Sequence, residues 1–257
     1  MPQTARNPEK SAALYRMVMP GHVCPFGIKS KWLLESHGYT VADHHLTTRE
    51  MTDAFKAEHN VDTTPQAFIG NVRIGGYDEV RERVGKTVIR EGDTTYRPVI
   101  AIFAVAFLMG IAISWVAFGT INVVRTLEWF IASAMILLGL QKVQDVESFS
   151  TMFLNYDLLA KRWVPYGYLY PYAETLAGLL MLAGAFMWLS IPLALFIGSV
   201  GAASVFKAVY IDKRELKCAC VGGGSNVPLG FVSLTENLMM IAMAVWMLLR
   251  YGLGLGL

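Results

Sequence analysis

The chain has 257 residues, of which 54% are hydrophobic and only 16% are charged, and its formal net charge is +2. Ordinary soluble domains carry roughly a quarter charged residues, so this composition excludes a simple soluble protein. The near-neutral charge and the lack of a nucleic-acid motif exclude a nucleic-acid partner. Charges concentrate before Arg97 and long apolar runs follow it, which predicts a polar N-terminal domain and a membrane domain.

The N-terminal region begins with a polar stretch, residues 1–12, without the apolar segment of a secretory signal. We expect a flexible tail there. A strand is predicted at residues 13–19 and a helix from Ile28 onward, with Cys24 and Pro25 between them. Proline favours the first helical turn, so Cys24 lies at the helix N-terminus, where free N–H groups and the dipole favour a thiolate. We interpret Cys24 as a reactive cysteine; the alternative is a buried structural cysteine.

The following segments continue to alternate between strands and helices. Residues 39–46 alternate like a strand, and a polar helix runs from Thr48 to about residue 60. Two short strands at 67–69 and 72–74 are joined by Gly70 and Asn71, and a last helix covers about 77–88. The order βαβαββα predicts a small α/β domain over residues 13–92, followed by a linker at 93–98.

Three motifs of this domain resemble the glutaredoxin family of the thioredoxin fold: Cys24-Pro25-Phe26, residues 63–69 and residues 73–78. The resemblance implies that Cys24 exchanges disulfides with glutathione as co-substrate. It also implies a cis-proline at Pro65. The glutathione-binding residues that it implies are Cys24, Phe26, Thr64, Pro65, Gly76, Tyr77 and Asp78.

Two departures from the family pattern affect this chemistry. Gly27 occupies the position of the second cysteine of dithiol members, so a monothiol route through a mixed disulfide remains. The family's lysine before the cysteine is absent, and His22 either stabilises the thiolate or is an ordinary surface histidine.

Residues 99–257 are predicted to form an all-α polytopic membrane domain of about five transmembrane helices. The second is short and contains Glu128, and the third and fourth are separated by a tight turn at 190–191. Lysine and arginine are concentrated in the loops on the side of the N-terminal domain, which predicts a cytoplasmic N-terminal domain at the inner or plasma membrane. The predicted spans are 99–118, 127–140, 169–189, 192–210 and 231–249.

A second cysteine motif, Cys218-Ala219-Cys220, precedes the last span. A disulfide across one intervening residue closes a small strained ring and exchanges readily, which favours a redox pair. The alternatives are a two-thiolate metal site, lipid attachment and inert thiols. Further metal ligands are missing nearby, so no metal is expected.

The membrane part from about Arg125 onward resembles the methylamine-utilisation MauE family, which is related to DoxX-like proteins. The features that carry this resemblance are Leu127-Glu128, residues 139–142, residues 171–180 and the Cys218-Ala219-Cys220 loop, although Val221-Gly222 replaces the family's Phe-Gly. The resemblance implies a redox or thiol-transfer role in the maturation of disulfide-containing client proteins.

Ionisable residues near the predicted cytoplasmic ends of the spans are Glu174, Lys207 and Glu236. Such groups are costly in a membrane and indicate function. They are candidates for one polar cluster beneath the cysteine loop that exchanges protons during thiol exchange. The alternative is that they pair or extend to the interface and only fix the bundle. Glu128 is expected near the opposite face.

These features predict a membrane-anchored, glutathione-linked thiol–disulfide oxidoreductase in which monothiol Cys24 relays with the Cys218/Cys220 pair. Its partners are glutathione, the lipid bilayer and a disulfide-containing client protein. The alternative is a glutathione-binding sensor, or a regulatory module of a transporter, without turnover.

Overall fold

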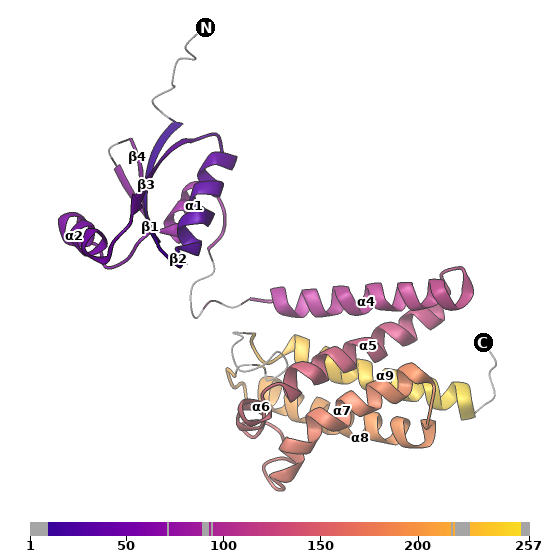
Figure 1. The fold of residues 1–257 in the computed structure, drawn as a ribbon. Helices are drawn as coiled ribbons and strands as arrows, with labels where there is room; N and C mark the ends of the chain where they lie inside the picture. The colour runs from indigo at the N-terminus through magenta and orange to yellow at the C-terminus, as the bar shows by residue number, and fades with distance from the viewer. Residues whose placement is uncertain are drawn as a thin grey trace. The chain divides into compact units, whose positions relative to one another are not determined.

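The computed structural model describes residues 10–70, 72–88, 93, 95–216, 218 and 227–252. The chain divides into two compact units, Met1–Glu91 and Gly92–Leu257 (Figure 1). The first combines a sheet with short helices, and the elements described for the second are all helices.

A mixed β-sheet forms the centre of the first unit. β1 (Ser11–Met19) pairs in parallel with β3 (Thr40–Leu46) and antiparallel with β4 (Gln66–Ile69). β4 in turn pairs antiparallel with β5 (Val72–Gly75). The sequence did not predict β2 (His22–Val23), which pairs antiparallel with the end of β1 and leads the chain into the next helix.

Helices cover both faces of this sheet (Figure 1). α1 (Pro25–Ser36) and α3 (Tyr77–Arg83) contribute to the core that buries Leu14 of β1. α2 (Arg49–His59) lies on the other face, where Tyr15 stacks on one of its aromatic rings. Successive strand residues point to opposite faces, so neighbouring residues of β1 enter different layers.

Most of the predicted elements of this unit are present. Thr48 accepts a hydrogen bond from the backbone N–H of Met51 and so caps α2 at the predicted residue. The last predicted helix, 77–88, is too long, because α3 ends at Arg83. The predicted turn residue Asn71 lies outside the described residues.

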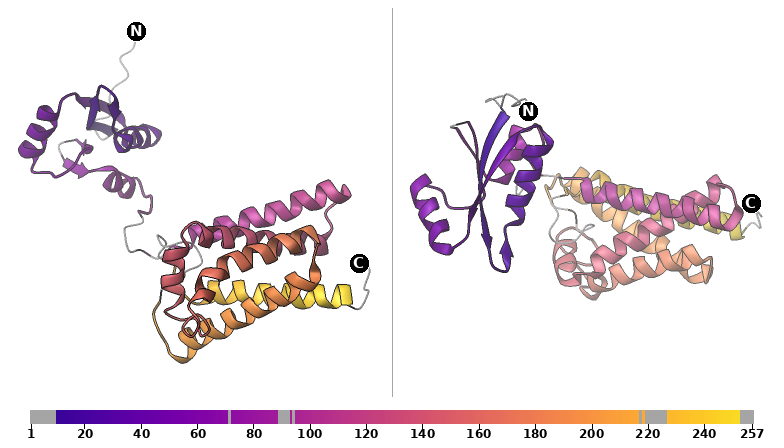
Figure 2. Two further views of the ribbon diagram at one scale, coloured as in Figure 1. Left: turned by 60° about the horizontal axis from the view of Figure 1, so that its bottom comes forward. Right: turned by 45° about the horizontal axis from the view of Figure 1, so that its top comes forward.

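Five long helices and one short helix build the second unit (Figure 2). α8 continues directly into a π-helical turn, Lys207–Ile211. The helices are α4 (Arg97–Phe118), α5 (Val123–Val143), α6 (Val146–Phe153), α7 (Pro165–Ala183), α8 (Met187–Phe206) and α9 (Phe231–Gly252).

Four helices of the described chain are long and apolar enough to cross a membrane: α4, α5, α8 with its π-helical turn, and α9. The sequence predicted about five membrane spans, and four helices of the described chain qualify as candidate spans. α7 is not among them, because tyrosines, two prolines and Glu174 make it more polar. The second predicted span, 127–140, was too short, because α5 runs to Val143 and includes Lys142.

The turn predicted at residues 190–191 is misplaced. α7 ends at Ala183, and Gly184 follows with φ +64°, a left-handed conformation that favours glycine and stops a helix. Ser190 and Pro192 lie inside α8, which begins at Met187. The predicted span 169–189 therefore joins the end of α7 to the start of α8.

The long helices pack in chain order, α4 on α5, α5 on α7, α7 on α8 and α8 on α9. Successive helices run in opposite directions (Figure 2). One end of the bundle, here called the linker end, therefore holds the starts of α4 and α9 and the end of α5.

Gly139 allows α5 and α7 to approach closely. A Cβ at this position would lie 3.1 Å from the backbone nitrogen of Thr175 and 3.2 Å from its Cα. Small residues at such contacts let helix backbones approach each other in membrane bundles. The close contact brings the last turn of α5, with Lys142, toward the part of α7 that holds Glu174.

We predict that Gly139→Ala destabilises the bundle by about 1–3 kcal/mol, because the added methyl group meets backbone atoms that cannot move freely. Thermal unfolding of the full chain in detergent measures the effect. Gly167→Ala in α7 is the matched control: its Cβ would meet no atom closer than 3.7 Å. Equal melting temperatures for the two variants would contradict the close contact.

Candidate functional site

Cys24 occupies the N-cap position of α1, as predicted, and Pro25 is the first helical residue. Its backbone N–H donates to the Met17 carbonyl at 3.2 Å, and its carbonyl accepts from the N–H of Ile28 at 3.2 Å. The residue is 8% exposed, and its thiol is free. The thiol therefore lies at the amino end of a helix, just below the surface.

Gly27 stands where a dithiol site would carry its second cysteine, and Arg16 fills the adjacent space. A Cβ on Gly27 would lie 2.7 Å from Arg16 Cβ and 2.8 Å from its Cδ. A cysteine at this position would require the Arg16 side chain to shift. Packing as well as sequence thus leaves Cys24 without a second thiol in this unit.

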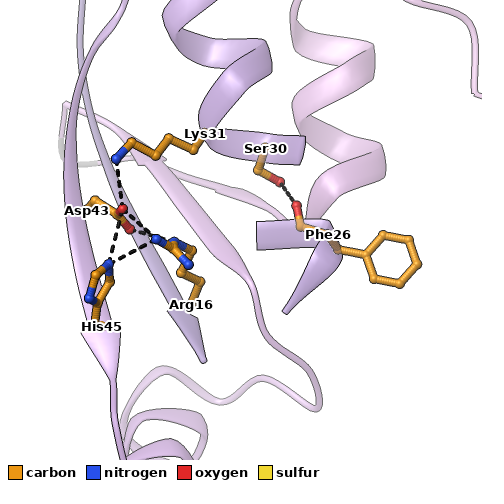
Figure 3. A network of polar contacts seen from close by, with 6 residues as sticks. All are labelled: Arg16, Phe26, Ser30, Lys31, Asp43 and His45. Atoms are coloured by element: carbon orange, nitrogen blue, oxygen red, sulfur yellow. Dashed lines mark hydrogen bonds and ion pairs between the residues drawn. The ribbon is translucent and has the colours of Figure 1, made fainter. Parts of the chain in front are cut away.

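Arg16 is held in place by a network of charged side chains (Figure 3). Its Nε and Nη2 donate to the two carboxylate oxygens of Asp43 at 2.8 and 2.9 Å, and Lys31 Nζ donates to Asp43 Oδ2 at 3.0 Å. His45 Nε2 lies 3.2 Å from the same oxygen. Burial alone raises the pKa of Asp43, but the hydrogen bonds from Arg16, Lys31 and His45 outweigh it and hold that pKa well below its usual range.

The other residues implied by the glutaredoxin resemblance also lie near one another. The Thr64–Pro65 peptide bond is cis, and the position of a Cβ on Gly76 is 3.5 Å from the Pro65 carbonyl oxygen. The rings of Phe26 and Tyr77 are 6.1 Å apart. α1 and α3 thus bring together the rings of Tyr77 and of Phe26, which lies two residues after Cys24 in the chain. Asp78 lies in the first turn of α3.

Two cations flank the aromatic pair. Lys29 Nζ lies 5.7 Å from the centre of the Phe26 ring and 5.8 Å from that of Tyr77. The Arg81 guanidinium lies 5.8 Å from the Tyr77 ring centre. The Phe26 ring is 55% exposed, so the pair offers a basic aromatic surface beside the cysteine helix.

In the second unit Cys218 is disulfide-bonded and fully buried. Its backbone N–H donates to the Val227 carbonyl at 2.7 Å, and its sulfur lies 3.0 Å from the hydroxyl oxygen of Ser233 in α9. Val99 at the start of α4 packs against it. The second predicted cysteine of this loop, Cys220, lies outside the described residues.

Three buried ionisable residues from three helices meet near the linker end. Lys142 of α5 donates from Nζ to Glu174 Oε2 of α7 at 2.6 Å and to Glu236 Oε1 of α9. The three residues are 2%, 0% and 5% exposed. We call them the buried triad. The candidate residues Glu174 and Glu236 are thus brought together, but by Lys142, which lies beyond the predicted end of the second span at residue 140.

Lys207, the predicted cation of this cluster, does not join it. Its ammonium binds Asp212 at 2.7 and 2.9 Å, and its side chain is 48% exposed. The π-helical turn at the end of α8 carries it to the surface. The sequence did not predict Lys142 as a member of this site, because the predicted span ended at residue 140. The motif at residues 139–142 that resembles the MauE family does include it.

A small cavity of about 10 Å³ lies beside the triad. Lys142 and Glu236 line it, as do Ser233 and Asn237 of the first turns of α9. The Asn237 Nδ2 donates to the Ser233 carbonyl at 2.7 Å. This volume is about that of a single water site. Ser233, whose hydroxyl contacts the Cys218 sulfur, therefore lines the same cavity as Lys142 and Glu236 of the triad.

Glu128 lies at the opposite end of the bundle, as expected. Its carboxylate accepts hydrogen bonds from Arg125 at 2.9 Å, from the Trp246 indole at 2.8 Å and from Arg250. This buried site joins α5 to α9 and shares no residue with the triad.

The second unit is a helix bundle with four helices long and apolar enough to cross a membrane among its described residues, which indicates an integral membrane protein. Residues 120–250 match the family model described as methylamine utilisation protein MauE, and the chain belongs to the MauE family. Neither the curated proteins nor the solved structures contain a match to the chain.

We predict that Asp43→Asn destabilises the strands β1 and β3 by about 2 kcal/mol, because the buried Arg16 and the partly exposed Lys31 lose their charged acceptor. Hydrogen exchange of the full chain, followed by mass spectrometry of β1 and β3 peptides, measures this loss. The folded-state pKa of Asp43 is lowered, so its contribution is present above about pH 4 and is lost as the pH falls through the folded value. The difference between the two proteins should therefore shrink in acid.

The matched control is Asp53→Asn on α2, whose ion pairs of 3.7 and 4.0 Å lie at the surface. It should change protection by no more than about 0.5 kcal/mol. Equal effects of the two variants would contradict the structural importance of the network.

Proposed function

We propose that this protein carries out glutathione-linked thiol–disulfide exchange at the membrane, with Cys24 as the exchanging thiol and the Cys218 disulfide as its redox partner. The observation that carries the proposal is the contrast between a free Cys24 and a disulfide-bonded Cys218 in one chain. The chain has three cysteines, so we assign Cys220 as the residue bonded to Cys218.

The topology of the first unit supports a thioredoxin-like fold for the Cys24 domain. The strand order is β3-β1-β4-β5, with β1 and β3 parallel and β4 and β5 antiparallel to their neighbours. α1 follows the β1–β2 segment and begins at the cysteine. These features, together with the cis bond before Pro65, agree with the glutaredoxin resemblance of residues 13–92.

The surface beside Cys24 supports glutathione as the co-substrate. Glutathione carries two carboxylates and one ammonium group, and thus a net negative charge near neutral pH. Lys29 and Arg81 provide positive charge around the Phe26–Tyr77 pair. In the proposed complex these cations take the place of the lysine that glutaredoxins carry before the cysteine.

The reaction balances without a metal or a further cofactor. The Cys24 thiolate attacks the disulfide of Cys218 and Cys220, forms a mixed disulfide and releases one thiolate. A first glutathione thiolate attacks the Cys24 sulfur, forms glutathionylated Cys24 and releases the second thiolate of the pair. A second glutathione then regenerates Cys24. Two glutathione molecules become one glutathione disulfide, and the cysteine pair is reduced and available to a disulfide-containing client protein.

The basic residues of the linker end support a cytoplasmic orientation at the inner or plasma membrane. Lys161 and Arg162 precede α7, and Lys213 and Arg214 follow α8. Cytoplasmic loops carry an excess of such residues. The cytosol is also the compartment that keeps thiols reduced, which suits a reaction driven by glutathione.

We predict that adding reduced glutathione to intact membranes reduces the Cys218 disulfide in the parent protein and leaves it oxidised in Cys24→Ser, because only the parent has the exchanging thiol. Alkylation of free thiols followed by mass spectrometry of the full chain measures the redox state. Dithiothreitol serves as the control, since it should reduce the disulfide in both proteins. Equal reduction by glutathione in both proteins would contradict a relay through Cys24.

We also predict that Lys29→Glu weakens glutathione binding about tenfold, because a charge-assisted contact is replaced by repulsion. Isothermal titration of the full chain in detergent measures the dissociation constant. Arg49→Glu, an exposed charge reversal on α2 across the sheet, should leave binding unchanged. Equal losses in both variants would indicate a general charge effect and contradict a site at Lys29.

A further inference from the structure

We propose that Cys218 is the leaving sulfur of its disulfide and that the buried triad supplies the proton which the departing Cys218 thiolate takes up. This inference rests on the proposed thiol–disulfide function, and it assigns distinct tasks to the two sulfurs and to residues of three helices.

The burial of Cys218 decides which sulfur is attacked. Cys218 is 0% exposed and packs between Val99 and Val227. An attacking thiolate must approach one sulfur of a disulfide while the other sulfur leaves. Because the surroundings of Cys218 exclude an external thiolate, the attack falls on the sulfur bonded to it, and Cys218 departs with the electron pair of the broken bond.

A thiolate at Cys218 would be a charge in a buried place, which is costly unless a donor or proton meets it. Ser233 Oγ lies 3.0 Å from the sulfur. A disulfide sulfur can only accept, so the hydroxyl is the donor in this contact. The same hydroxyl is correctly placed to stabilise the negative charge that develops on the leaving sulfur.

The charged groups of the triad are suited to holding an extra proton. It combines one ammonium with two carboxyl groups, so full ionisation would leave a net negative charge among residues that are at most 5% exposed. Within the described residues, Glu174 Oε1 is buried without a hydrogen-bond donor. A proton shared by the carboxyl groups of Glu174 and Glu236 removes the excess charge and converts an unsatisfied acceptor into a donor.

The path from the triad to the sulfur is short. Ser233 and Glu236 are one turn apart on α9, and both line the small cavity with Lys142. A single water site there would connect the carboxyl group with the hydroxyl. Among the residues that the structure describes, two tyrosines also face this region: Tyr156, which lines the cavity, and Tyr170, whose ring lies 5.5 Å from Lys142 Nζ.

In the proposed step, the attacking thiolate forms a bond to the neighbouring sulfur, and the bond from that sulfur to Cys218 breaks. Cys218 receives the electron pair and then the proton of Ser233, which is replaced from the triad through the cavity. The products are a mixed disulfide, the Cys218 thiol and a triad that has lost one proton. In the reverse reaction the triad takes the proton back and the Cys218 thiolate attacks.

The test uses dithiothreitol as the attacking thiol and the full chain in detergent, so that it does not depend on glutathione or Cys24. The rate of Cys218 thiol formation is followed by rapid alkylation and expressed per dithiothreitol thiolate, between about pH 6 and about pH 9. We expect the parent rate to fall at high pH as the triad loses its proton. Glu236→Gln and Glu174→Gln should be slower by about 100-fold near neutral pH and lack this fall.

Glu128→Gln is the matched control, since it removes a buried carboxylate at the opposite end of the same bundle and should keep the parental rate and pH profile. Thermal unfolding of every variant separates folding from rate. Triad variants that are less stable but keep the parental rate and pH profile would show that the triad only fixes the bundle and would overturn the inference. Triad dependence with dithiothreitol, combined with no reduction by glutathione, would refute the proposed function while supporting the proton supply.

Discussion

The membrane unit depends on burying Lys142 between Glu174 and Glu236. A buried ammonium is tolerated only with acceptors around it, and these acceptors come from two other helices. α5, α7 and α9 must therefore approach at one depth and in one register. Gly139 makes the approach of α5 to α7 possible, because any larger residue would meet Thr175. The two ion pairs of Lys142 thus fix three helices relative to one another.

In the first unit, charged side chains join two strands and one helix. Arg16 and Asp43 join neighbouring parallel strands, and Lys31 ties α1 to the same carboxylate. This network holds the Arg16 side chain beneath Gly27, three residues after Cys24. The cysteine helix therefore starts on a rigid base, and the site retains a single thiol. A monothiol site suits the proposed exchange, in which the Cys218 disulfide is the second redox element.

The parts that the sequence predicted well are those encoded by local pattern. Cys24-Pro25 marked the helix start, Thr48 marked the cap of α2, and the apolar runs marked four membrane helices. Errors arose for two reasons: in one helix a local stop signal outweighed the apolar run, and in another a packing contact extended the helix. Gly184 ended α7 earlier than the apolar run suggested, and α5 continued past the expected end because Lys142 finds buried partners in α7 and α9.

The sequence by itself determined the division into a polar α/β unit and an apolar helical unit, the position of Cys24 and the carboxyl groups of the membrane site, because these follow from composition and helical periodicity. Only the tertiary structure decided which cation meets Glu174 and Glu236, and it selected Lys142 instead of Lys207. It also decided that Cys218 is buried beside Ser233. Such pairings depend on helix register and depth, and these are set by contacts between residues far apart in the chain.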